Sequence, residues 1–263
     1  MTDWQIVSAI LSGGIVGLSL GLIGGGGSIL AVPLLVYIVG IDSPHKAIGT
    51  SAVAVAASAL FSLVAHARAQ TVKWPCAVVF AVFGIAGAAG GAFLGKLVDG
   101  QRLLGLFGLV MIAVGLSMLR PRQSGDNPDV KLTSESARQL FPALAGICAL
   151  VGGLSGFLGI GGGFLIVPGL INATAMPLIN AIGSSLVSVA AFGATTAASY
   201  AHSGLVDWPV AGFFVAGGAI GGAIGSWAAN RLATRKTMLI RIFAVVVAAV
   251  GIYVVARGIG AFI

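Results

Sequence analysis

Two clusters of glycine interrupt apolar stretches of the sequence. They comprise Gly24, Gly25, Gly26 and Gly27 in the first half of the chain and Gly159, Gly161, Gly162 and Gly163 in the second. A helix that breaks inside a membrane exposes backbone groups, which must be buried in protein or line a cavity. Glycine lets the backbone approach a ligand, and a helix that starts after the break directs its positive dipole end there. The clusters predict an anion site. The alternative is close helix packing, and repetition in both halves favours the site.

Pairs of small hydroxyl residues follow each cluster at matched positions. They are Thr50 with Ser51, and Ser184 with Ser185. Their hydroxyl groups can donate hydrogen bonds to an anion without adding a charge that would retain it. The alternative, of equal weight, is hydrogen bonding between helices or to a carbonyl of the same helix. We include these four residues with the glycines in the predicted substrate site.

Basic side chains near these segments are candidates for gating or steering. His66 and His202 end corresponding apolar segments, each directly after an alanine, and imidazole titrates near neutral pH. No acidic residue stands at helical spacing from either histidine, so a polar tip at the membrane surface is the competing interpretation. Arg68 is expected to concentrate an anionic substrate at the mouth of the site.

Patterns typical of catalysis or metal binding are missing from the sequence. None of the seven acidic residues lies deep in an apolar segment, and there is no G-x-S-x-G, H-E-x-x-H or phosphate-loop motif. Cys76 and Cys148 stand in apolar segments without a neighbouring metal ligand. We expect neither an enzyme nor a bound metal or cofactor.

The composition identifies the elements that must position these residues. Of the 263 residues, 58% are apolar and only 8% are charged. Several charge-free runs reach the roughly 20 residues that a membrane-crossing helix needs. The formal net charge is +7, but the basic residues are dispersed between apolar segments, so a nucleic-acid partner is not expected. The sequence predicts an all-α polytopic membrane protein.

An internal repeat runs through the chain. The stretch Gly21–Pro33 aligns without a gap on Gly156–Pro168, and the following motifs match at a spacing of about 134 residues. His66 is paired with His202 in this alignment. The repeat predicts two homologous transmembrane units joined by a polar cytoplasmic linker. Their boundaries are 1–119 for the first repeat, 120–138 for the linker and 139–263 for the second repeat.

Each repeat contains five apolar segments, of which the second is short. They are Trp4–Ile23, Gly27–Ile41, Ala47–His66, Trp74–Leu97 and Leu103–Leu119, then Leu140–Leu158, Gly162–Ala175, Ala181–Ala201, Trp208–Asn230 and Met238–Ala256. If the first two segments make one broken crossing, the 14 Lys and Arg residues divide 7 to 7 between the two sides. If both cross, the repeats are inverted and the division is 10 to 4. The positive-inside rule favours the second plan, with the linker cytoplasmic and both termini outside. We expect eight to ten membrane segments, with a glycine-broken helix pair in each inverted repeat.

The combined motifs resemble a known family. The glycine run from Gly21 to Gly27 with Pro33, the Thr50-Ser51 motif, His66 and Trp74, all with counterparts in the second half, are similar to the sulfite exporter TauE/SafE family of membrane anion transporters. The resemblance implies export or exchange of sulfur-containing anions, such as sulfite, sulfonates or sulfoacetate, across a bacterial inner membrane. The family's glycine motifs fall on the two clusters described above.

The sequence therefore predicts a secondary transporter that works by alternating access, with the two glycine breaks facing each other near the membrane midplane. Three alternatives stay open: an anion channel, a carrier of a non-sulfur carboxylate, and a membrane protein whose glycines only pack helices. A small anion and the lipid bilayer are the expected partners, and a homo-oligomer is compatible with this plan.

Overall fold

A computed structural model describes residues 2–119, 146, 148–159, 166–167, 170, 176–231 and 236–258. The regular secondary structure in these ranges is helical, without a strand, and seven of the helices are long and apolar enough to cross a bilayer. The prediction of an all-α polytopic membrane protein is confirmed. The predicted linker and three of the candidate glycines, Gly161, Gly162 and Gly163, lie outside the described residues.

The N-terminal segment enters the helical bundle and then turns back. Helix α1 (Asp3–Ile23) ends at Gly24, where φ is +77°, a value that favours glycine. Gln5, near the start of α1, lines the same small pocket as Gly40 to Ser43, so the segment leaves the bundle at the end where it entered. The return arm consists of a 3-10 helix η1 (Gly24–Leu30), helix α2 (Ala31–Leu34) and a π-helix η2 (Leu35–Val39).

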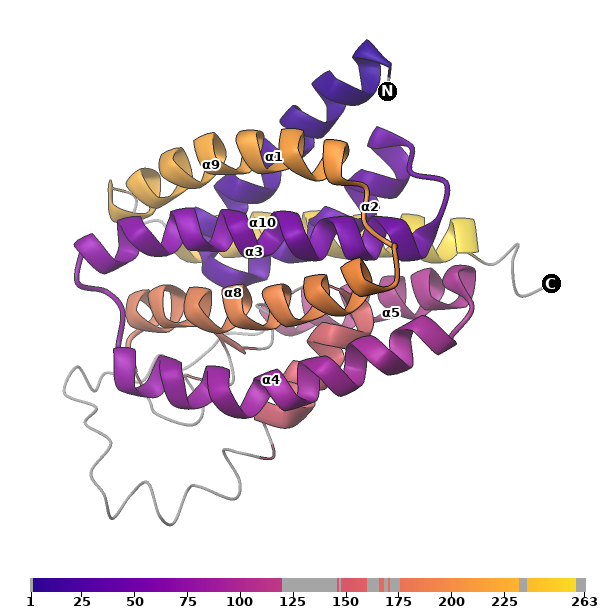
Figure 1. Cartoon of the computed structure of the whole chain (residues 1–263). Helices are drawn as coiled ribbons and strands as arrows, with labels where there is room; N and C mark the ends of the chain where they lie inside the picture. The colour runs from indigo at the N-terminus through magenta and orange to yellow at the C-terminus, as the bar shows by residue number, and fades with distance from the viewer. Residues whose placement is uncertain are drawn as a thin grey trace.

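Three long helices follow in each half of the chain. They are α3 (Pro44–Arg68), α4 (Trp74–Leu97) and α5 (Gly100–Leu119), and then α8 (Leu178–His202), α9 (Trp208–Arg231) and α10 (Lys236–Gly258). Figure 1 shows the α3–α4 connection at one end of the bundle and the α8–α9 connection at the other. We call these the α3–α4 end (loop 69–73) and the α8–α9 end (loop 203–207). Helices α3 and α8 lie side by side and run antiparallel.

The two halves exchange helices. Helix α1 packs against α9 of the second half, and the helix Cys148–Leu158 packs against α4 of the first. Both contacts bring backbones together at glycines. A Cβ added at Gly17 would collide with the carbonyl of Gly218, and one added at Gly152 would collide with the carbonyl of Gly84. Because close approach of small residues drives helix association in lipid, each half is completed by a helix from the other.

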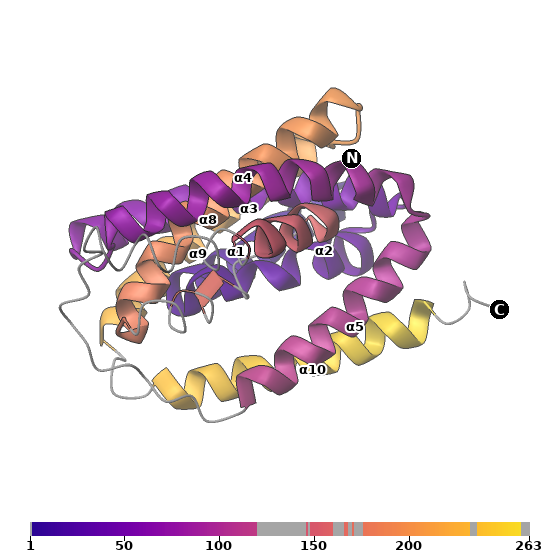
Figure 2. The same cartoon turned by 90° about the horizontal axis from the view of Figure 1, so that it is seen from below.

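Helices α5 and α10 form an antiparallel pair on one side of the molecule (Figure 2). Gly108 and Gly115 of α5 face α10, and a Cβ added at Gly108 would lie 3.0 Å from the carbonyl oxygen of Gly251. The pair therefore uses the same small-residue packing as the exchanged helices, while the glycine breaks lie against α3 and α8.

Charges divide unevenly between the two ends of the bundle. The elements at the α3–α4 end carry basic side chains without an acidic one in the described ranges: Arg68, Lys73, Arg231 and Arg241. The elements at the α8–α9 end carry both signs: Asp3, Asp42, Asp99 and Asp207 with Lys46, Lys96, Arg102 and Arg257. The electrostatic potential at the two ends is expected to differ accordingly.

Candidate functional site

The first glycine break is held by side chains from two other helices. In a continuous α-helix the Gly25 N–H would bond to the Gly21 carbonyl. Here the Gly25 N–H donates to Ser185 Oγ of α8 at 3.3 Å, and the Gly21 carbonyl oxygen lies 3.3 Å from His66 Nε2 of α3. All of η1 is buried. The break therefore keeps partners for these backbone groups through side chains that are distant in sequence.

Around the second glycine break, Gly159 has a φ of +69°. Its carbonyl oxygen accepts a hydrogen bond from Ser51 Oγ at 3.1 Å, and the same hydroxyl lies 2.8 Å from the Ile48 carbonyl. A Cβ added at Gly159 would collide with the Ile48 side chain. Gly24 has the equivalent environment, because a Cβ there would lie 3.0 Å from both Ile182 Cγ2 and Ser185 Oγ.

Each break is therefore packed against the first turns of a long helix from the opposite half. The sequence interpretation grouped the glycines with the hydroxyl pairs, and the structure places members of both groups in contact. Each contact joins the two halves: Gly25 of the first half bonds to Ser185 of the second, and Gly159 of the second half bonds to Ser51 of the first. We call the contacts at the α3–α4 end the first seam (Gly21 to Gly25, His66, Thr71, Ser184 and Ser185). The second seam lies at the α8–α9 end (Thr50, Ser51, Gly159, Tyr200 and Leu205).

Thr50 and Ser184 cap helices across the same seams. Thr50 Oγ1 accepts the N–H of Asp207, which precedes α9, at 2.9 Å. Ser184 Oγ accepts the N–H of Lys73, which precedes α4, also at 2.9 Å. Both side chains are fully buried. Since unpaired N–H groups at a helix start are costly to bury, these two hydroxyls have a structural task in addition to any contact with a substrate.

The two breaks do not face each other. Helices α3 and α8 cross where a Cβ added at Gly193 would lie 3.1 Å from the Ala56 Cβ. Ser51 stands five residues before Ala56, and Ser185 stands eight residues before Gly193 on the antiparallel helix. At ~1.5 Å per residue the two serines lie about 20 Å apart along the helix direction. The breaks thus flank the crossing, one on each side, and the expectation that they meet at one level is corrected.

The histidine pairing inferred from the sequence is also corrected. The turns after α3 and α8 are equivalent at an offset of 134, because Thr71 N–H donates to the His66 carbonyl and Leu205 N–H to the Tyr200 carbonyl. His66 therefore corresponds to Tyr200, and Arg68 corresponds to His202. His66 is only 1% exposed, whereas Arg68 and His202 are exposed. Pairing His66 with His202 shifted the alignment of the two halves by two residues. The constant offset of 134 residues in the neighbouring motifs was the signal in the sequence that points to Tyr200 instead.

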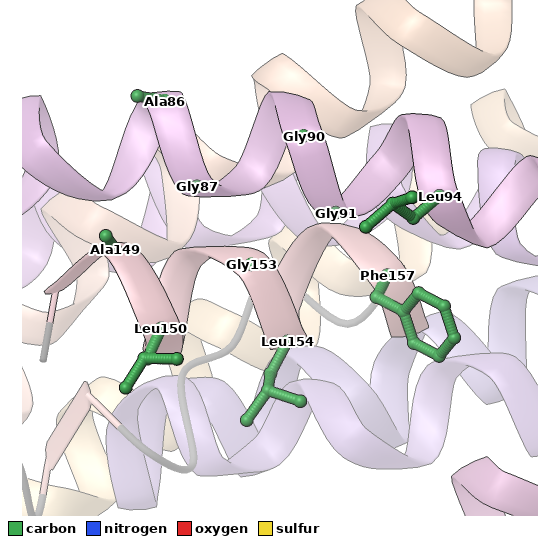
Figure 3. A pocket seen from close by; sticks show the side chains of 10 residues that line it. All are labelled: Ala86, Gly87, Gly90, Gly91, Leu94, Ala149, Leu150, Gly153, Leu154 and Phe157. Carbon is green, nitrogen blue, oxygen red and sulfur yellow. The ribbon is translucent and has the colours of Figure 1, made fainter. Parts of the chain in front are cut away.

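An apolar groove of about 590 Å³ runs between α4 and the helix Cys148–Leu158 (Figure 3). Glycine, alanine, leucine and phenylalanine line it, and no hydrogen-bonding side chain does. At the matched positions between α1 and α9, Leu18 replaces Gly153 and Ile224 replaces Gly90. A groove without polar groups does not suit an anion, so it is not part of the candidate site.

Metal ligands do not gather in the described part of the chain: no three of its His, Cys, Asp and Glu side chains form a group that could hold an ion. The polar groups around the breaks are hydroxyls, amides, carbonyls and one imidazole. This donor set can bind a small anion through hydrogen bonds.

Comparison with known proteins agrees with this arrangement. The profile of the family described as sulfite exporter TauE/SafE matches residues 9–254. A probable membrane transporter protein of Xylella fastidiosa (strain 9a5c) is 51% identical over 98% of this chain and 97% of its own length. The probable membrane transporter protein YunE of Bacillus subtilis (strain 168) is 29% identical over 97% of this chain and 99% of its own. No solved structure shows significant similarity.

The family match covers nearly all described helices, including both glycine breaks and both hydroxyl pairs. A relative that is 51% identical over almost its full length extends this agreement to the whole chain. The chain belongs to the sulfite exporter TauE/SafE family and is a multi-pass membrane transporter.

Proposed function

We propose that this protein is a secondary transporter that exports or exchanges small sulfur-containing anions (sulfite, sulfonates or sulfoacetate) across a bacterial inner membrane by alternating access. The observation that carries the proposal is the first glycine break, which is fully buried and is held by Ser185 and His66 instead of by its own helix. Interrupted helices at membrane depth are tolerated where they are buried in protein or line a substrate path.

The proposed topology has two inverted repeats of five segments. Three observations support it: α3 and α8 are antiparallel, the α3–α4 and α8–α9 loops lie at opposite ends, and the return arm leads back to the end where α1 begins. The α3–α4 end, with basic side chains only among its described residues, is then the cytoplasmic end. In this plan the two seams open alternately, and Arg68 attracts the anion to the first.

The substrate is proposed to approach the backbone at the two glycine clusters. Gly26 illustrates why the first cluster can receive it: Gly26 is buried, yet a Cβ there would have one described atom within 4 Å, Ile23 Cγ2 at 3.4 Å. Gly27 differs, since a Cβ there would collide with the α1 backbone. The proposed contacts are Gly24, Gly25, Gly26, Gly27, Gly159, Gly161, Gly162 and Gly163, with the hydroxyls of Thr50, Ser51, Ser184 and Ser185.

The hydroxyls divide into two roles in this proposal. Thr50 and Ser184 each accept one N–H and retain a proton that can be donated to an anion. Ser51 shares its proton between the carbonyls of Ile48 and Gly159, and Ser185 donates its proton to the Ile182 carbonyl while it accepts the Gly25 N–H. Both serines therefore act by holding the breaks in place.

The test is counterflow of labelled sulfite, sulfoacetate and isethionate in proteoliposomes that hold the purified protein, beside empty liposomes. Saturable exchange supports a carrier and identifies its substrate class. Flux that does not saturate and shows no counterflow indicates a channel instead. No flux of any of these anions by folded protein overturns the sulfur-anion proposal and directs the search to carboxylates.

A matched pair of variants tests the site. Gly26→Ala adds one methyl group at the break, and we expect exchange to fall about tenfold or more because small displacements at a binding site have large kinetic effects. Gly90→Ala is the control, since no described atom lies within 4 Å of an added Cβ there. Equal exchange in both variants would remove the first glycine cluster from the site.

A further inference from the structure

Among the described residues, His66 is the one buried side chain that can carry a positive charge. The described Asp, Lys and Arg residues belong to the two ends of the bundle. His66 lies in the last turn of α3, where the helix dipole favours a positive charge. Imidazole is also the side chain that changes its charge near neutral pH. The equivalent residue in the second seam, Tyr200, does not offer this chemistry.

The hydrogen bonds of His66 accommodate two protonation states without moving the ring. The Gly21 carbonyl can only accept, so Nε2 carries a proton. Thr71 Oγ1 lies 2.9 Å from Nδ1 and 3.0 Å from the His66 carbonyl oxygen. When the hydroxyl donates to that carbonyl, Nδ1 must donate to the hydroxyl and the ring is an imidazolium. When the hydroxyl turns toward Nδ1, the ring is neutral.

A column of hydroxyls leads from His66 toward the centre of the bundle. Ser58 and Ser62 stand eight and four residues before His66 on α3, and they lie against Gly218 and Gly222 of α9. Their Oγ atoms, and that of Ser226 on α9, are buried and have no hydrogen-bond partner among the described residues. Such groups are normally satisfied, so they indicate a place for water or for a transferred proton.

The second seam has a different set of hydroxyls. At an offset of 134, Phe192 replaces Ser58 and packs against Gly84, and Ala92 stands where α9 has Ser226. Thr196, in place of Ser62, and Tyr200 keep buried hydroxyls without a partner among the described residues, as does Ser188 on the same helix. Phe192 interrupts this second set, whereas the serines of the first seam lead to His66 without a break.

The charged side chains that the described elements bring to the end of the bundle near His66 are basic. On its own helix, Arg68 follows two residues later and is exposed, and Lys73 in the next loop is half-buried. On α9, Arg231 stacks on the Trp227 ring at 4.5 Å. Asp3 of α1 lies at the other end.

We propose that His66 is the proton-binding site of the carrier and that one proton moves with each anion. The proposal rests on the proposed function. An anion inside the membrane requires a counter-charge, and protonated His66 supplies it one turn from the first glycine break. The anion and the imidazolium neutralise each other while the site is closed to both sides. The proton leaves His66 with the anion through the hydroxyl column when the second seam opens.

The test uses isethionate, a sulfonate that is fully ionised throughout the neutral range and so carries no proton of its own. Wild-type proteoliposomes contain a pH-sensitive dye and are clamped at zero membrane potential with potassium and valinomycin. When the outside pH is one unit below that of the lumen, the inward proton gradient should drive isethionate to about tenfold accumulation in the lumen. The lumen should acidify at the same time. Counterflow without accumulation or acidification overturns proton coupling while leaving the carrier intact. Absence of counterflow contradicts the proposed function instead.

Two glutamine variants assign the proton to a residue. His66→Gln keeps a donor for the Gly21 carbonyl but does not titrate, so it should retain counterflow and lose gradient-driven accumulation. His45→Gln is the control, because His45 lies in the first turn of α3, at the opposite end of the bundle and outside both seams, and should behave as wild type. Full accumulation by His66→Gln overturns the assignment. If this variant does not fold, wild-type flux that is independent of membrane voltage from −100 to +100 mV supports electroneutral coupling, and voltage-dependent flux contradicts it.

Discussion

The two seams share a backbone plan and differ in chemistry. In both, a glycine with positive φ packs against the first turns of a long helix of the other half, and a hydroxyl from that helix bonds to the break. In both, a second hydroxyl caps the next helix. The first seam adds His66 and a column of unpaired serine hydroxyls, whereas the second has Tyr200 and Thr196, whose hydroxyls also have no partner among the described residues.

This difference separates the features that both seams need for folding from the features that occur in one seam only. Features present in both seams position the breaks, so changing them should affect both halves similarly. Features present in the first seam alone are candidates for coupling or regulation, because the second seam packs without them. Four pairs of matched variants test this separation.

The largest effect is expected at the exchanged helices. Gly91→Ala and Gly225→Ala place a methyl group against the carbonyl of Gly153 and of Leu18, respectively, so each should lower the free energy of unfolding by about 4 kcal/mol or prevent folding. Thermal unfolding and size-exclusion chromatography in detergent measure the effect. Gly90→Ala, which adds its methyl group where no described atom lies within 4 Å, is the control. Damage by only one of the pair would contradict equivalent packing of the halves.

The next effect distinguishes the seams. His66→Phe leaves the Gly21 carbonyl without its side-chain partner and removes one of the two hydrogen bonds of the Thr71 hydroxyl, and we expect a loss of about 1–3 kcal/mol of stability. Tyr200→Phe removes a hydroxyl that has no described partner, so the loss should be below about 0.5 kcal/mol. Denaturation midpoints of the two variants provide the comparison. Equal losses would show that the two positions are not chemically different in the way described.

A smaller and symmetric effect is expected at the caps. Thr50→Val and Ser184→Ala each leave one buried N–H unpaired at the start of α9 or α4, with a loss of about 1–2 kcal/mol. Thr50→Ser and Ser184→Thr retain the hydroxyl and should therefore keep most of the wild-type stability. Differential scanning fluorimetry of all four variants is sufficient. If the hydroxyl-retaining variants are as unstable as Thr50→Val and Ser184→Ala, the loss of stability comes from packing and not from the lost hydrogen bond.

The smallest effect concerns the turns that end α3 and α8. Gln70 has a φ of +55°, and the equivalent residue, Gly204, has a φ of +67°. Gln70→Gly should raise the free energy of unfolding by up to about 1 kcal/mol, and Gly204→Ala should lower it by about the same amount, because only glycine adopts this conformation without strain. The midpoint of thermal unfolding measures both. No described atom lies within 4 Å of a Cβ at Gly204, so a large loss there would have another cause.

Particular residues show how far the sequence reached. Hydropathy and the duplicated glycine and Ser/Thr motifs predicted the membrane class, the repeat and the family, because these depend on local composition and spacing. The predicted level of the breaks and the predicted pairing of His66 with His202 were wrong, since the first depends on where α3 crosses α8 and the second on a turn that ends both helices.

The sequence by itself determined that helices form, where they break and that the plan occurs twice, because helix length, glycine and hydrophobicity act locally. Only the tertiary structure decided that Gly25 is held by Ser185, that Gly159 is held by Ser51 and that α1 completes the opposite half. Each of these contacts joins residues more than a hundred positions apart, and two equivalent glycine clusters and two equivalent hydroxyl pairs allow pairing within or between halves. Packing of the antiparallel α3 and α8 selects the crosswise pairing, and that choice brings His66 next to a buried break.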